Sequence, residues 1–147
     1  MFLVDSIKVG VFWQPAQQRQ RLPENAMNRR VILVIAFILG GLSWAICPLV
    51  SDHFEPFDTG IGFLIGQVTM SVFTAYIGFV ADYKKLLVAV LGLYLGLNAY
   101  AYVFGSSEAK AWAVLLLFTS IFLCIIPLVV GLSASGINAF LKSRTSS

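Results

Sequence analysis

The residues that could do chemistry in this sequence are few, and the densest group lies between two apolar runs. The segment 51–58 (SDHFEPFD) contains four potential metal ligands, Asp52, His53, Glu55 and Asp58. A metal site needs ligands held in fixed geometry by further contacts, and so short a segment offers little to hold them. His53 is the only histidine, so a Ser-His-Asp triad would depend on it, and no nucleophile-elbow motif accompanies it. We therefore predict a solvated acidic loop, with no metal, no cofactor and no catalytic residues, in a protein that is not an enzyme.

A second group of polar residues lies inside the apolar runs, with one residue in each of four runs: Ser43, Gln67, Asn98 and Thr119. At about 1.5 Å of rise per helical residue, all four lie roughly 9–12 Å below the same membrane surface. One interpretation is that they hydrogen-bond between helices and hold the bundle together, at about 0.6 kcal/mol per bond. The other is that they form the floor of an outward-facing cavity for a polar ligand. The sequence favours the first interpretation and leaves the second open.

The elements that position these residues follow from the composition. The chain has 147 residues, of which 59% are hydrophobic and 12% charged, whereas a soluble domain carries about 25% charged residues. This excludes a soluble enzyme, a disordered tail and a disulfide-stapled secreted module. Four uncharged runs reach the length of about 20 residues that a membrane helix requires, at about 31–50, 59–81, 86–104 and 111–133. The runs are continuous and do not alternate, so we predict an all-α membrane protein rather than a barrel.

The connectors between these four runs are short, which predicts an antiparallel, up-down-up-down bundle of four transmembrane helices. Nine of the ten basic residues lie on the side of the termini, so the positive-inside rule predicts that both termini are cytoplasmic (N-in/C-in) in a bacterial inner membrane. Residues 1–30 form a cytoplasmic arm in which residues 2–13 could be an interfacial helix. Alternatively, Met27 is the true start and residues 1–26 are a mis-annotated extension. The transmembrane domain covers 31–141, with 134–141 turning into the interface, and 142–147 are a cytoplasmic tail.

Small residues one helical turn apart predict close helix packing. Gly62 and Gly66 lie in the second run, and Gly92 and Gly96 in the third. This spacing lets two backbones approach closely, so the simplest prediction is that these two faces pack on each other. A homodimer contact is the alternative. Pro127 lies in the middle of the fourth run, where it removes a backbone hydrogen bond and should kink the helix.

Residues 78–85 (GFVADYKK) resemble the G-x-x-x-D-R-x-G-R-R signature that major facilitator transporters carry between their second and third helices. The spacing from Gly78 to Asp82 matches, but the arginine after the aspartate and the second glycine are missing. Those transporters need twelve helices, so we assign no family. A tight hairpin in which Asp82 pairs with Lys84 and Lys85 accounts for the same residues.

For function, the main observation is that none of the four runs contains Asp, Glu, Lys, Arg or His. Ionisable residues in membrane helices usually mark ion or proton pathways, so a proton-coupled transporter is disfavoured. The first hypothesis is a non-catalytic protein that contacts a membrane-protein partner, as an accessory or assembly subunit or as an immunity-type protein. The predicted architecture of the chain is similar to that of the small helical immunity proteins against pore-forming colicins. The alternatives are a small channel or transporter working as a homo-oligomer, and a lipid-acting membrane enzyme. The lipid bilayer is an expected partner and nucleic acid is not.

Overall fold

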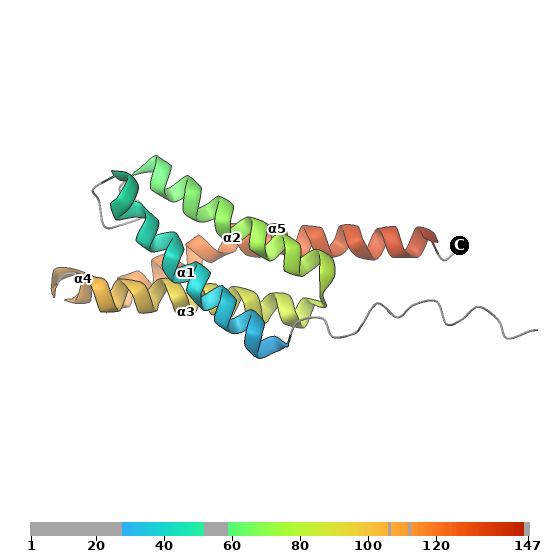
Figure 1. The fold of residues 1–147 in the computed structure, drawn as a ribbon, viewed down its shortest axis with the longest axis horizontal. Coiled ribbons are helices and arrows are strands. Elements are labelled where there is room, and N and C mark those ends of the chain that lie inside the picture. The colour runs from blue at the N-terminus through green and yellow to red at the C-terminus, as the bar shows by residue number, and fades with distance from the viewer. Residues whose placement is uncertain (1–27, 52–58, 106, 112, 146–147) are drawn as a thin grey trace, which may run out of the picture.

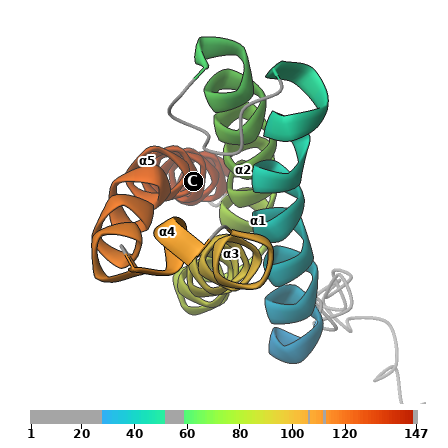
Figure 2. The ribbon, with the colours of Figure 1, turned by 90° about the vertical axis from the view of Figure 1, so that its left-hand side faces the viewer.

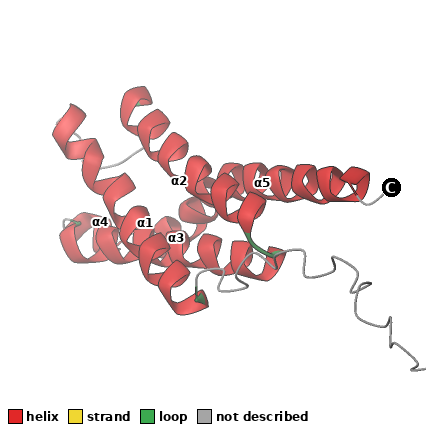
Figure 3. Ribbon diagram, turned by 45° about the vertical axis from the view of Figure 1, so that its right-hand side comes forward, coloured by secondary structure: helices red, strands yellow, loops and turns green. Residues whose placement is uncertain are grey.

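The computed structural model describes residues 28–51, 59–105, 107–111 and 113–145, and within these ranges the chain is helical apart from short connections, with no strand (Figures 1 and 3). The helices are α1 (Arg29–Ser51), α2 (Gly60–Val80), α3 (Tyr83–Phe104), α4 (Ser107–Ala111) and α5 (Ala113–Thr145). In this part of the chain, four helices are long and apolar enough to cross a membrane: α1, α2, α3 and α5. The predicted all-helical class is therefore confirmed, and so is the number of helices long and apolar enough to span a membrane. The predictions for residues 1–27 and for the acidic segment 52–58 lie outside the described residues.

Two helices begin at residues whose side chains cap the first turn. The hydroxyl of Thr59 accepts a hydrogen bond from the Gly62 N–H at the start of α2, at 3.4 Å. The carboxylate of Asp82 accepts one from the Lys85 N–H at the start of α3, at 2.9 Å. Asp is among the preferred N-cap residues because its oxygen satisfies an otherwise unpaired backbone donor. Asp82 therefore ends the short turn after α2 and begins α3.

Helix α5 is longer than the sequence predicts. It has 33 residues, which at about 1.5 Å each span roughly 50 Å, against about 30 Å for the hydrocarbon core of a bilayer. The helix continues past Ser133 through residues 134–141 to Thr145. The side chain of Asn138, in this extension, donates a hydrogen bond to the Phe79 carbonyl of α2 at 2.6 Å. In Figure 1 the first and second halves of α5 run in different directions, and Pro127 lies inside the helix.

The helices do not pack in chain order. Helix α1 packs most extensively on α3, and α2 on α5, while α2 and α3 share a smaller contact although only two residues join them. The backbones of the described parts of α1 and α5 do not approach each other closely. Viewed along the bundle, the order around it is therefore α1, α3, α5, α2 (Figure 2). The second and third helices lie across the bundle from each other, because the short turn between them leads the chain over a diagonal.

The core is built from all four long helices. One cluster of buried side chains contains Ala36, Trp44, Met70, Leu93, Leu97, Ala101, Leu123 and Cys124, and a second contains Ile32, Ile77, Leu86 and Ala89. The outer faces are also apolar, and Leu64 and Phe122, for example, are 61% and 67% exposed. A soluble monomer seldom exposes apolar surface over large patches. Apolar side chains on both the inside and the outside are what a bundle surrounded by lipid requires.

Candidate functional site

Two of the four predicted polar residues bond their own helix. The buried Ser43 hydroxyl donates to the Gly40 carbonyl at 2.7 Å. The Thr119 hydroxyl donates to the Leu116 carbonyl at 3.1 Å. Both bonds join residues three apart on one helix, so these two hydroxyls satisfy themselves locally. The four residues share a depth in the sequence, but these contacts do not bring them together as one site.

Gln67 instead reaches from α2 to α5. Its Nε2 donates to the Leu123 carbonyl at 3.0 Å, and the side chain is only 5% exposed. Leu123 lies four residues before Pro127, and in a helix its carbonyl would accept from the N–H of residue 127. Proline has no N–H. The Gln67 amide therefore supplies the hydrogen bond that Pro127 cannot, and its Oε1 is buried without a partner among the described residues.

Thr74 makes a second bond from α2 to the same part of α5, and the sequence analysis did not single it out. Its hydroxyl is fully buried and lies 2.7 Å from the Pro127 carbonyl, and it also lies within reach of two carbonyls of its own helix. Thr74 follows Gln67 by two helical turns, so the two side chains lie on one face. The seven-residue spacing from Gln67 was the signal in the sequence that could have pointed to Thr74. It gives no indication that the partner on the other helix is Pro127.

The predicted glycine faces both lie against α1. A Cβ at Gly66 would lie 3.4 Å from the Ser43 carbonyl oxygen, and one at Gly62 would lie 2.9 Å from the Cys47 Sγ. A Cβ at Gly92 would lie 2.6 Å from the Ala36 Cβ, and one at Gly96 would overlap the Phe37 carbonyl. The prediction that the faces of the second and third helices pack on each other is therefore wrong. Since α1 covers all four glycines, these faces are also not open to a second copy of the chain.

Asn98 joins α3 to α5 through Ser120, the neighbour of the predicted Thr119. The Ser120 hydroxyl lies 3.2 Å from Asn98 Oδ1, and Asn98 Nδ2 donates to the Tyr94 carbonyl at 2.7 Å. Ser120 also lies 2.7 Å from the Leu116 carbonyl, and its single hydrogen serves one acceptor at a time. Thr119 has the expected depth, but the adjacent Ser120 faces α3.

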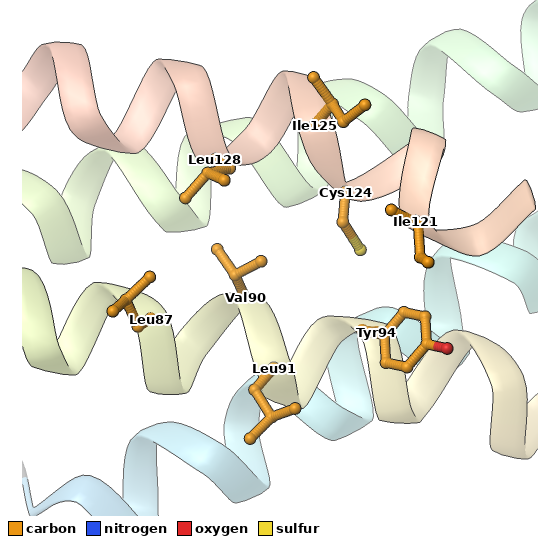
Figure 4. A pocket seen from close by; sticks show the side chains of 8 residues that line it. All are labelled: Leu87, Val90, Leu91, Tyr94, Ile121, Cys124, Ile125 and Leu128. Carbon is orange, nitrogen blue, oxygen red and sulfur yellow. The ribbon is translucent and has the colours of Figure 1, made fainter. Parts of the chain in front are cut away.

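Two hollows lie along the contact between α3 and α5. The first, which we call the α3/α5 groove, has a volume of about 480 Å³. It is lined by Leu87, Val90, Leu91 and Tyr94 from α3 and by Ile121, Cys124, Ile125 and Leu128 from α5, and in Figure 4 Val90 and Cys124 lie between the two helices. The second, the Asn98 cavity, measures about 540 Å³ and is lined by Phe37, Leu95, Asn98, Ala99, Tyr102, Lys110, Leu116 and Leu117. Of the four predicted polar residues, Asn98 alone lines either hollow.

Among the described residues, no three His, Cys, Asp or Glu side chains lie close enough together to hold a metal ion. Comparison with protein-family models, with curated proteins and with solved structures finds no match. The function is therefore argued from the packing and the surfaces of this chain.

Proposed function

We propose that this small integral membrane protein is a non-catalytic protein of a bacterial inner membrane, with both termini in the cytoplasm. It acts through helix–helix contact with a membrane-protein partner, as an accessory or assembly subunit or as an immunity-type protein. The observation that carries the proposal is the α3/α5 groove, an apolar surface hollow that the chain's own helices leave unfilled. The polar side chains of the spans are largely used within the bundle, on backbone carbonyls.

The sequence in which paired residues follow one another along two helices supports the antiparallel arrangement in this proposal. Along α1 and α2 the contacts run in opposite senses, because Cys47 meets Gly62 while the earlier Ser43 meets the later Gly66. Along α2 and α5 they advance together. Gln67 bonds Leu123, Thr74 bonds Pro127 and Gly78 meets Gly131. These orders are the ones expected when consecutive helices alternate in direction.

The basic residues support the proposed orientation. Arg29 and Arg30 begin α1, Lys84 and Lys85 lie in the first turn of α3, and α5 ends with Lys142 and Arg144. If the helices alternate, these three ends lie on one side of the membrane. Basic residues near short loops collect on the cytoplasmic side.

The groove suits a helix from another protein because of what lines it. Leu87 and Leu91 of α3 are 51% and 52% exposed, and Ile121 and Ile125 of α5 are 48% and 45% exposed. Association between membrane helices depends on van der Waals packing and on interhelical hydrogen bonds. Branched side chains on both walls of a groove give a partner helix a shaped surface to pack against.

The test is co-purification of the full chain from native membranes in mild detergent. We expect an unrelated membrane protein in fixed stoichiometry. Leu91→Trp fills the groove and should lose this partner, while Leu64→Trp, on an equally accessible face of α2, should retain it. A lone symmetric homo-oligomer with a water-filled axis would contradict the proposal, as would equal retention by both variants.

The topology is tested separately, by labelling in intact cells with a membrane-impermeant maleimide. In a chain with Cys47 and Cys124 replaced by alanine, we expect Ser107→Cys to react from outside. Lys84→Cys should react only after the cells are opened. The reverse pattern would overturn the orientation without bearing on the groove.

A second candidate function is a small oligomeric channel or transporter, and the observation in its favour is that the Asn98 cavity reaches a polar side chain inside the span. Asn98→Leu separates the two candidates. Loss of a measured flux from a bundle that stays stable would favour the channel. A bundle that only loses stability, by about 0.6 kcal/mol for one interhelical bond, would assign Asn98 to packing.

A further inference from the structure

We propose that the Asn98 cavity binds one phospholipid with an anionic headgroup, taken from the leaflet at the C-terminal end of α3. The headgroup phosphate lies at Lys110 and Tyr102, and an acyl chain lies along the cavity towards Leu95. This site is distinct from the α3/α5 groove and does not depend on the proposed partner.

The cavity has one polar end and one apolar end. Phe37, Leu95, Ala99, Leu116 and Leu117 form apolar walls contributed by α1, α3 and α5. Lys110, of α4, lines the same cavity, and its Nζ lies 5.9 Å from the centroid of the Tyr102 ring. A hollow whose walls are mostly apolar apart from Asn98, with a positive charge from Lys110, complements an amphiphile with a negative head.

The position of Lys110 needs a reason. It is the only basic residue between Lys85 and Lys142, and so the only one near the ends of the spans opposite the basic side. Bacterial membrane proteins avoid lysine and arginine on that side. A lysine binds phosphate as a point charge, and Tyr102 adds a phenolic hydroxyl that can donate to the same group.

The dimensions fit a single leaflet. Tyr102 follows Leu95 by seven positions in α3, which is roughly 10 Å at 1.5 Å per residue. Half of the hydrocarbon core of a bilayer is about 15 Å. At the inner end, the Tyr94 hydroxyl lies 3.5 Å from the carbonyl of Leu117, which lines the cavity. A cavity of this length suits one acyl chain within a leaflet rather than a helix that crosses both leaflets.

The experiment is native mass spectrometry of the full chain in detergent. The protein is titrated with phosphatidylglycerol or with phosphatidylcholine of the same acyl chains. We expect a single tight site that prefers phosphatidylglycerol. Lys110→Gln should weaken it about fivefold, as follows from roughly 1 kcal/mol per basic residue acting on anionic lipid. Lys84→Gln, at the other end of α3, is the matched control and should leave the affinity unchanged.

A second variant tests the apolar part. Leu95→Trp should narrow the cavity and weaken both lipids, while leaving the preference between them. Equal effects of Lys110→Gln and Lys84→Gln would overturn the site, because they would indicate general attraction of lipid to basic residues. Displacement of the lipid by millimolar inorganic phosphate would assign the cavity to a free anion. A co-purified membrane protein lost on Leu95→Trp but kept on Lys110→Gln would assign it to a partner helix.

Discussion

The two closest helix contacts of the bundle are built differently. Helices α1 and α3 meet through glycines, and a Cβ at Gly40 would overlap the Leu93 carbonyl just as one at Gly96 would overlap that of Phe37. Helices α2 and α5 also cross at a glycine pair, Gly78 and Gly131, but here side chains of α2 bond carbonyls of α5 beside Pro127.

The difference teaches that a proline in a membrane helix constrains its neighbour. Lipid provides no water to satisfy a free carbonyl, so α2 must carry a donor opposite Pro127, and Gln67 is that donor. The contact between α1 and α3 involves no carbonyl left free by a proline, so close packing of the two backbones is enough to hold the helices together. The first contact should therefore be sensitive to side-chain volume and the second to loss of a hydrogen-bond donor.

The largest effect is expected at Gly96. Gly96→Ala places a Cβ on the Phe37 carbonyl, and because backbone must move on both helices we expect a cost of about 3 kcal/mol. Unfolding in mixed detergent and dodecyl sulfate micelles, followed by circular dichroism, measures it.

The control for this variant is Gly136→Ala, since a Cβ at Gly136 meets nothing within 4 Å. In an exposed helix that change removes backbone freedom and stabilises by up to about 1 kcal/mol. Equal stabilities for the two variants would show that α1 and α3 are not held at glycine distance.

A smaller effect is expected at Gln67. Gln67→Met keeps the length of the side chain but leaves the Leu123 carbonyl buried without a donor, at a cost of about 1–2 kcal/mol. The comparison is made in two backgrounds. With Pro127→Ala, residue 127 regains an N–H that can reach Leu123, so the same substitution should cost about 1 kcal/mol less. Equal costs in both backgrounds would mean that Gln67 does not compensate for the proline.

The smallest effect is expected at Thr74. Thr74→Val removes the hydroxyl that lies 2.7 Å from the Pro127 carbonyl, and a single interhelical bond in a membrane protein contributes about 0.6 kcal/mol. Thr69→Val is the matched control, because the Thr69 hydroxyl bonds Ile65 on its own helix. Thermal unfolding in detergent should rank the wild type and Thr69→Val together, with Thr74→Val below them.

The long helices were predictable because a helix that is to lie in lipid needs a continuous run of apolar residues, which the sequence shows directly. Each long helix begins and ends within a few residues of its apolar run, except that α5 continues to Thr145. Residues 134–141 are more polar than the preceding run. A rise in polarity indicates where a helix is expected to leave the lipid, but it does not indicate where the helix ends. The segment stays helical, and Asn138 ties it to α2.

The partners of the faces were not predictable in the same way. A pair of glycines on Gly62 and Gly66 marks a face that another backbone approaches, but the spacing says nothing about which helix does so. Likewise, depth in the membrane follows from residue number, whereas direction around the helix changes by a large angle at each residue. That is why Ser120 rather than Thr119 meets Asn98, and why the depth predicted for Gln67 does not indicate its bond to Leu123.

The glycine contact of α1 with α3 also has a consequence for biogenesis. The ribosome completes α1 at Ser51, but the helix that covers Gly40 is not complete until Phe104. At about 5–20 residues per second, this interval lasts roughly 3–10 s. Throughout it, Gly40 has no α3 backbone to pack against. The contact of α2 with α5 can form only later still, because Leu123 and Pro127, the partners of Gln67 and Thr74, lie in the last long helix to be made.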